Sequence, residues 1–381
     1  MIYLDYNATT PLHPQVEDAM QQLWREAFGN PASRHGAGRR AWEAVESARE
    51  AVAQWAGGDP DDVIFTSGAT ESNVLALMGR FEALLAEGRN PVSIRAAVSA
   101  IEHPCVADCA QRMIARGAAV HWIPVLPGGQ VDVAFFEHHG PFDIVSVMAA
   151  NHETGAIQPL ADIARRLPPS SYFHCDGAQW CGRFAGGMDQ WGVSALSLSA
   201  HKMYGPKGVG ALLLKRGWRL EPILPGSQEA GMRGGTVAAP LIAGMAEAAR
   251  LAGREAAVEN ERVAQLRERL WQGIVESGCG AVRTIPPGLA CANTLHVRFP
   301  GRRGERVVDL LDRQGICCSS GPACASGASE PSPVLQAMGY DEAACWEGVR
   351  FSIGRLTTEQ EIGAAVREIS QRLQRRNPHV A

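Results

Sequence analysis

The sequence predicts an α/β fold with a mainly parallel, seven-stranded sheet and a smaller α+β region near the C-terminus. Between residues 60 and 215, seven short apolar runs alternate with helical patterns. These runs are continuously apolar, which is typical of strands buried on both faces. After residue 258 the alternation gives way to separate strands and helices. We therefore expect a large domain over 15–257 and a small domain formed by 1–14 and 258–381.

Each element follows from its own pattern. In 71–88, apolar residues form a broad stripe at helical spacing. Residues 239–277 are rich in Ala, Glu and Arg and predict one or two helices. A last helix should begin after Thr358, with Glu359 and Glu361 in its first turn. The expected strands of the large sheet are 63–68, 96–102, 119–125, 144–150, 171–176, 195–200 and 209–215. In the small domain we expect strands at 293–299 and 349–354 and a helix at 304–315.

Composition excludes several classes of protein. The 381 residues carry a net charge of −4 and no basic run, which argues against nucleic acid as the main partner. No apolar stretch approaches the roughly 18 residues of a membrane span. The first residues lack the apolar block of a secretory signal. We expect a cytosolic protein whose ten cysteines are reduced. They form no CxxC pair and no zinc-like Cys/His spacing, so no metal site is expected.

Three of the expected strands end in residues that can carry chemistry. After 63–68, Gly68, Ala69 and Thr70 open a helix whose N–H groups favour a phosphate, although an ordinary strand-to-helix turn fits as well. Asp176 ends another strand and could be a helix cap, a metal ligand or the partner of a ring nitrogen. Lys202 follows a third strand and can form a Schiff base with a carbonyl cofactor, where the alternative is a solvated loop lysine. Pyridoxal 5′-phosphate (PLP) requires a lysine, a carboxylate and a phosphate cradle together.

A loop rich in Gly, Ser, Ala and Pro, residues 316–335, contains three cysteines. Such a composition predicts a surface loop, where a thiol is accessible. We expect Cys317 and Cys318 to be packed thiols at the start of this loop. Cys324 lies within its small-residue stretch.

Taken in order, the motifs of the chain resemble those of group I, NifS/IscS-type cysteine desulfurases of the class V aminotransferase fold family. The resemblance covers nearly the whole chain. It rests on YLDYNATTP (3–11), GNPASRH (29–35), FTSGATES (65–72), EH (102–103), NHETG (151–155), HCDGAQ (174–179), SAHKMYGPKG (199–208), GMRGGT (231–236), SSGPACASG (319–327), EPSPVL (330–335) and RFSIGR (350–355).

The resemblance implies a fold type I, PLP-dependent enzyme. Lys202 would hold PLP, Asp176 would pair with the pyridine nitrogen, and His103 would stack on the ring, although by itself His103 reads as a capping or core histidine. The ring's phenolic oxygen would be bound by Gln179, and the substrate carboxylate by Asn151 and Arg350. The resemblance assigns the phosphate to Ala69, Thr70, Ser199 and His201, with Thr236 from the second subunit of a homodimer.

The implied reaction converts L-cysteine to L-alanine. The sulfur of the substrate cysteine would form a persulfide on Cys324 and pass to a sulfur-acceptor or iron–sulfur scaffold protein. Three departures from the family pattern stand out: His152 replaces a common Asn, Pro322 stiffens the loop, and the last residues, RLQRRNPHVA, leave the acceptor open. The alternatives are a selenocysteine lyase or aminotransferase of the same fold, or a non-catalytic sulfur-relay partner.

Overall fold

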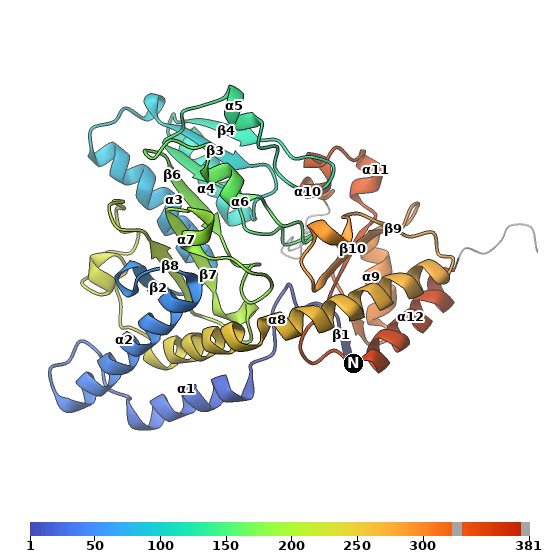
Figure 1. Cartoon of the computed structure of the whole chain (residues 1–381), viewed down its shortest axis with the longest axis horizontal. Coiled ribbons are helices and arrows are strands. Elements are labelled where there is room, and N and C mark those ends of the chain that lie inside the picture. The colour runs from blue at the N-terminus through green and yellow to red at the C-terminus, as the bar shows by residue number, and fades with distance from the viewer. Residues whose placement is uncertain (322–329, 375–381) are drawn as a thin grey trace, which may run out of the picture.

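A computed structural model describes residues 1–321 and 330–374, and its central sheet is the one that the sequence predicts (Figure 1). Seven strands lie in the order β2-β8-β7-β6-β5-β3-β4, and only β8 runs antiparallel to its neighbours. The α/β prediction is confirmed. The strands are β2 (Val63–Thr66), β3 (Arg95–Ser99), β4 (Ala119–Ile123), β5 (Ile144–Ser146), β6 (Tyr172–Asp176), β7 (Ala195–Ser199) and β8 (Gly210–Leu214).

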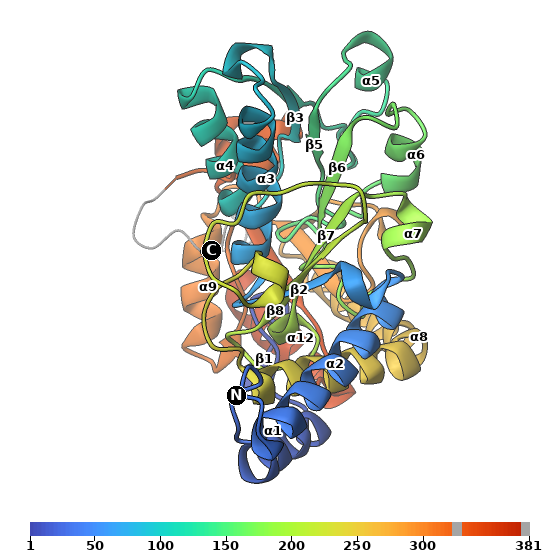
Figure 2. The ribbon, with the colours of Figure 1, turned by 90° about the vertical axis from the view of Figure 1, so that its left-hand side faces the viewer.

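Figure 2 shows helices on both faces of this sheet. Successive residues of a strand point to opposite faces, so each strand can contribute apolar side chains to both layers of helices. Phe65 packs in the core with α2 and α8, whereas its neighbour Ile64 packs in the core with α3 and α4. Both faces of the sheet are therefore apolar, as the continuous apolar runs indicate. The helices are α1 (Pro14–Glu26), α2 (Gly36–Ala56), α3 (Ala69–Ala86), α4 (Pro104–Ala115), α5 (Phe135–His138), α6 (Leu160–Ala164), α7 (Met188–Trp191) and α8 (Ala239–Glu276).

The segment expected to form one or two helices is the single 38-residue helix α8. Figure 1 shows it running from α1 and α2 to the smaller sheet and α12. Its buried residues up to Leu251 pack in the core of the large sheet, and those from Val263 onward pack in a second core. The expected boundary near residue 258 falls between these two stretches. The division into two domains stays a prediction, and the two separate cores support it.

The C-terminal part contains a three-stranded antiparallel sheet with β10 (Thr294–Arg298) between β9 (Val282–Arg283) and β12 (Gly348–Ser352). The capping residue of the last helix is Thr358, which exchanges hydrogen bonds with Glu361. Three short strands in the described part of the chain were not expected: β9, β1 (Ile2–Tyr3) and β11 (Ile316–Cys317), of which β1 and β11 pair in parallel. The segment 316–335, expected to be a loop, therefore begins with a strand. The helices here are α9 (Gly304–Asp312), α10 (Pro333–Ala337), α11 (Glu342–Cys345) and α12 (Glu359–Leu373).

The N-terminal segment joins the two parts of the molecule. Leu4 is buried in the core of the C-terminal part. A few residues later, Asn7 is also buried and contacts both parts. Among the described residues, no helix is both long and apolar enough to cross a bilayer.

Candidate active site

A cavity of about 550 Å³ lies beside the ends of β2, β6 and β7. It brings together eight residues that the sequence predicts for a cofactor site: Ala69, Thr70, His103, Asp176, Gln179, Ser199, His201 and Lys202. Asn151, Arg350 and Thr236 do not line it. Cys324 and Pro322 lie outside the described residues. The sequence therefore predicted eight of the 21 described residues that line the cavity, from motifs that are far apart in the chain.

Lys202 reaches the cavity because the chain turns sharply after β7. It closes a short 3-10 helix, η3 (Ala200–Lys202). Its Nζ donates hydrogen bonds to the backbone oxygens of Asn7 and Ala8, the second at 2.9 Å. Gln179 Nε2 donates to the same Asn7 oxygen at 3.1 Å. The N-terminal segment thus holds the amine at the cavity, a role for Asn7 that sequence reasoning missed.

Asp176 presents a buried carboxylate at the end of β6. Its Oδ2 accepts a hydrogen bond from Asn73 Nδ2 at 2.7 Å, and its Oδ1 accepts one from the Ala178 N–H at 2.9 Å. Nearby, burial and then the charge of Asp176 raise the pKa of Glu102 well above its usual range. Glu102 therefore stays protonated while its Oε1 accepts the Met148 N–H at 2.7 Å. The carboxylate of Asp176 lines the cavity, whereas the neutral acid of Glu102 lies behind the cavity wall.

The start of α3 offers free N–H groups to an anion. Its N-cap, Gly68, has φ of 155° and no side-chain cap, and a Cβ there would meet nothing within 4 Å. The helix is 18 residues long, so its dipole adds to the attraction at Ala69 and Thr70. Across the cavity, burial together with the charges of Lys202 and Lys207 lowers the pKa of His201 to about 4. His201 is therefore a neutral imidazole at neutral pH.

His103 is both a helix cap and a wall of the cavity. Its Nδ1 accepts the Cys105 N–H at 3.3 Å at the start of α4 and lies 3.0 Å from the Cys105 sulfur. This contact places the proton of the neutral ring on Nε2. Burial lowers the pKa of His103, the charge of Lys202 lowers it further, and Asp176 acts in the opposite direction. The capping role that its sequence position suggests is thus compatible with a role in the site.

His152, and not Asn151, projects a side chain into the cavity. Asn151 is buried, and its side chain is used by its own turn: Oδ1 accepts the N–H groups of Glu153 and Thr154 at 3.0 and 2.8 Å. The His152 ring lines the cavity 5.5 Å from the His103 ring, at 71°. Burial and the charges of His103, Arg350 and Lys202 hold the pKa of His152 well below 6.5.

Arg350 lies on β12 and is buried next to this turn. Its Nη1 donates to the His152 oxygen at 2.6 Å, and its Nη2 donates to Asp5 Oδ1 at 2.7 Å. Ser319 also donates to Asp5 Oδ1, at 2.9 Å, and its N–H donates to the Arg350 oxygen at 3.1 Å. The arginine thus fixes the first residues of the cysteine loop. Here Cys318 is buried, and Cys317 is half-buried on β11.

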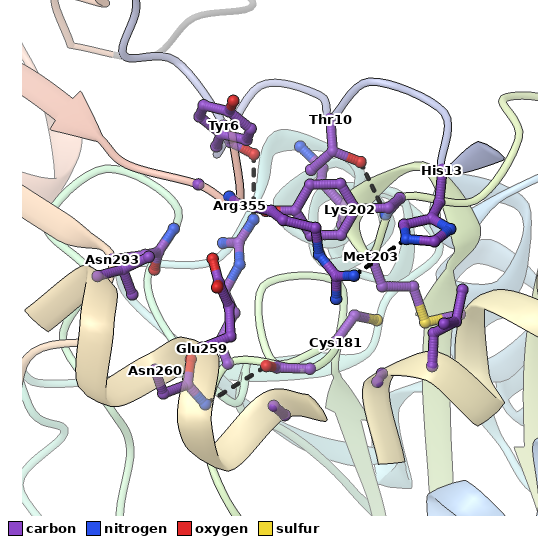
Figure 3. Close-up of a pocket in the computed structure, with 18 of the residues that line it drawn as sticks. Tyr6, Thr10, His13, Cys181, Lys202, Met203, Glu259, Asn260, Asn293 and Arg355 are labelled. Carbon is purple, nitrogen blue, oxygen red and sulfur yellow. Dashed lines mark hydrogen bonds between the residues drawn. The ribbon is translucent and has the colours of Figure 1, made fainter. Parts of the chain in front are cut away.

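A second cavity, which is also lined by Lys202, lies against α8 (Figure 3). Tyr6, His13, Glu259 and Arg355 contribute to its wall, and Arg355 donates to His13 Nε2 at 3.0 Å. Its volume is about 50 Å³. That space suits a few water molecules and not an aromatic cofactor. The larger cavity is therefore the candidate active site.

The sequence and the fold match known proteins along almost the whole chain. The model of the aminotransferase class-V family matches residues 2–364. Cysteine desulfurase of Homo sapiens is 38% identical over 381 residues, which covers 98% of this chain and 82% of that protein. Cysteine desulfurase IscS of Anaeromyxobacter sp. (strain Fw109-5) is 39% identical over 383 residues, with 98% and 93% covered. A solved structure of a NifS-like protein has a TM-score of 0.90 at 33% identity, with 97% and 98% covered. The chain belongs to the aminotransferase class-V family.

Proposed function

We propose that this enzyme is a PLP-dependent cysteine desulfurase, which converts L-cysteine to L-alanine and receives the sulfur as a persulfide on Cys324. The observation that carries the proposal is the meeting of Lys202, Asp176 and the α3 N-terminus at one cavity. The relatives that match nearly the whole chain are cysteine desulfurases, which supports the same reaction.

The residues around the cavity fit PLP in charge and in chemistry. The uncapped start of α3 suits a phosphate, and Lys202 Nζ is the amine that would bind the aldehyde carbon. A buried carboxylate, Asp176, suits a protonated ring nitrogen, and two donors already orient it. The volume of about 550 Å³ leaves room for an amino acid beside the cofactor.

PLP, when bound, supplies a conjugated ring that withdraws electrons from the α-carbon of the substrate. The residues of the chain do the rest. Lys202 would hold the cofactor, and its Nζ is the base that would accept the α-proton of the substrate. Asp176 keeps the ring nitrogen protonated. Cys324 would act as a thiolate that attacks the substrate sulfur: an S–S bond forms at Cys324, the Cβ–S bond breaks, and its electron pair stays on the substrate, where Cβ takes up a proton to become the methyl group of alanine.

Several finer assignments belong to the same proposal. Thr236 is exposed and lies outside the cavity of its own subunit, which supports a contact with the cofactor phosphate of the partner in a homodimer. Arg350 and Asn151 remain the proposed residues for the substrate carboxylate; His152, whose oxygen accepts a hydrogen bond from Arg350, lines the cavity. The acceptor is proposed to be a sulfur-acceptor or iron–sulfur scaffold protein. A cytosolic location stays a prediction.

The proposal is tested by loading the protein with PLP and supplying L-cysteine. We expect a PLP absorbance band and the formation of alanine, both lost in Lys202→Ala. The matched control is Lys215→Ala, because Lys215 is exposed and pairs only with Asp189 among the described residues. Amino transfer that depends on a keto acid, without alanine from cysteine alone, would instead indicate an aminotransferase.

A further inference from the structure

The loop that ends at Thr236 has a strained backbone at its tip. We call residues 226–236 the arm. Two consecutive residues in it, Glu229 and Ala230, have φ of 48° and 53°, a left-handed conformation that residues with a Cβ seldom adopt. Such strain persists only where the surrounding contacts enforce it, and it is concentrated at functional segments. The contacts that enforce it are therefore informative.

The tip of the arm is fixed by a buried ion pair. The Glu229 side chain is only 4% exposed and forms two parallel contacts of 3.1 Å with the guanidinium of Arg49 on α2. Its Oε2 also accepts the Phe65 N–H at 2.8 Å. Phe65 lies on β2, an edge strand of the large sheet. Glu229 therefore accepts a hydrogen bond from a backbone N–H that has no neighbouring strand to pair with. Bidentate arginine–carboxylate contacts fix geometry in addition to adding energy.

The other end of the arm is anchored at the predicted phosphate site. Arg233 Nε donates to Glu71 Oε1 at 2.9 Å, and Glu71 Oε2 accepts the Ser67 N–H at 2.8 Å. Glu71 lies in the first turn of α3 and lines the cavity. The arm also closes on itself, because the Gly235 N–H donates to Gln228 Oε1 at 3.0 Å, and it is tied to the preceding segment by the Gly234 N–H, which donates to the Leu224 oxygen at 2.8 Å. Only after these anchors does the chain reach the exposed Gly235 and Thr236.

We propose that Arg49 and Glu229 are positioning residues that lock the arm and thereby present Thr236 to the cofactor phosphate of the partner subunit. The inference rests on the proposed function, since it requires Thr236 to act across the dimer. The ion pair holds the tip of the arm in a strained turn, and the Arg233–Glu71 contact sets the distance of the arm from α3. The hydroxyl of Thr236 is then placed to bind the cofactor phosphate in the partner subunit.

The test compares Glu229→Gln, Thr236→Ala and the double variant in the full-length protein. Glu229→Gln keeps the shape and removes the charge; Arg216→Gln is the control, because Arg216 forms an exposed ion pair with Asp61. The measurements are the dissociation constant of PLP from absorbance titration, the dimer fraction from sedimentation, and the rate of tryptic cleavage after Arg233. Circular dichroism checks that each variant is folded.

We expect Glu229→Gln to weaken PLP binding about tenfold or more, to speed cleavage after Arg233, and to leave the dimer intact. Thr236→Ala should weaken PLP binding without changing the cleavage rate. The dissociation constant of PLP for the double variant should be no higher than that of the single variant that binds PLP less tightly, because both changes remove the same contact. Arg216→Gln should match the wild type in all three measurements.

Two results overturn the proposal, and they can be told apart. If Thr236→Ala weakens PLP binding but Glu229→Gln changes neither binding nor cleavage, the positioning role is wrong and the contact across the dimer stands. If Thr236→Ala leaves PLP binding unchanged, the contact across the dimer is wrong and the positioning role falls with it. The proposal is also contradicted if the fold-losses of PLP affinity in the two single variants multiply in the double variant, since the two residues would then act independently.

Discussion

The ion pair between Asp5 and Arg350 supports a quantitative prediction. Arg350 has a side chain that is 2% exposed, and its 2.7 Å contact with Asp5 is the only carboxylate contact that it makes among the described residues. Replacing Asp5 by Asn keeps an oxygen for Arg350 and Ser319 to donate to, but removes the charge. Breaking a buried ion pair costs about 3–5 kcal/mol when one partner is removed outright, and the retained hydrogen bonds should recover part of that. We expect the free energy of unfolding to fall by about 2 kcal/mol.

The assay is urea unfolding followed by tryptophan fluorescence. With a slope of about 3 kcal/mol per molar urea, the midpoint of Asp5→Asn should lie roughly 0.7 M below that of the wild type. Asp61→Asn is the matched control, because Asp61 pairs with Arg216 on the surface, where both side chains are more than half exposed. Its midpoint should shift by no more than about 0.2 M. Equal shifts in the two variants would refute the reasoning that burial sets the size of the effect.

Three further predictions concern titrating groups. Burial lowers the pKa of His174 to about 3, so this residue alone should cost the wild type about 2 kcal/mol of stability between pH 7.5 and 5, and His174→Gln should lose about that much less than the wild type over the same range in parallel unfolding curves. Burial raises the pKa of Glu102, so the wild type should lose stability relative to Glu102→Gln as the pH rises above about 4.5, whereas a stability difference that is constant or moves in favour of the wild type would count against the raised pKa. Burial lowers the pKa of His152 well below 6.5, so the pH profile of kcat/KM for His152→Asn should keep the wild-type shape around neutral pH, and the loss of an ionisation there would contradict the assigned pKa direction.

Local patterns predicted the sheet and the three strand ends that meet at the cavity, and the family resemblance supplied the other site residues. Continuous apolar runs marked all seven strands, and polar residues directly after the runs were placed together, as expected at the carboxyl ends of parallel strands. Asp176 ends β6 and Lys202 follows β7, and these two strands are direct neighbours in the sheet. Their meeting at one site follows from topology alone.

The remaining features depend on contacts that no local pattern encodes. Asn7 hydrogen-bonds Arg183 at 2.8 Å and Thr294 at 3.0 Å, across sequence separations of 176 and 287 residues. The two-residue strands β1 and β11 are too short to show a period. Whether Asn151 or His152 faces the cavity is decided by one turn, in which the amide of Asn151 caps the N–H groups that follow it.

The most direct test of the account is to follow the sulfur. The PLP-loaded protein is incubated with L-cysteine without reductant, alanine is assayed, and the persulfide is located by peptide mapping. The account predicts stoichiometric alanine and a persulfide on Cys324 alone, with Cys324→Ser retaining PLP but forming neither product at the wild-type rate. A persulfide on Cys317 or Cys318, or wild-type alanine formation by Cys324→Ser, would contradict it.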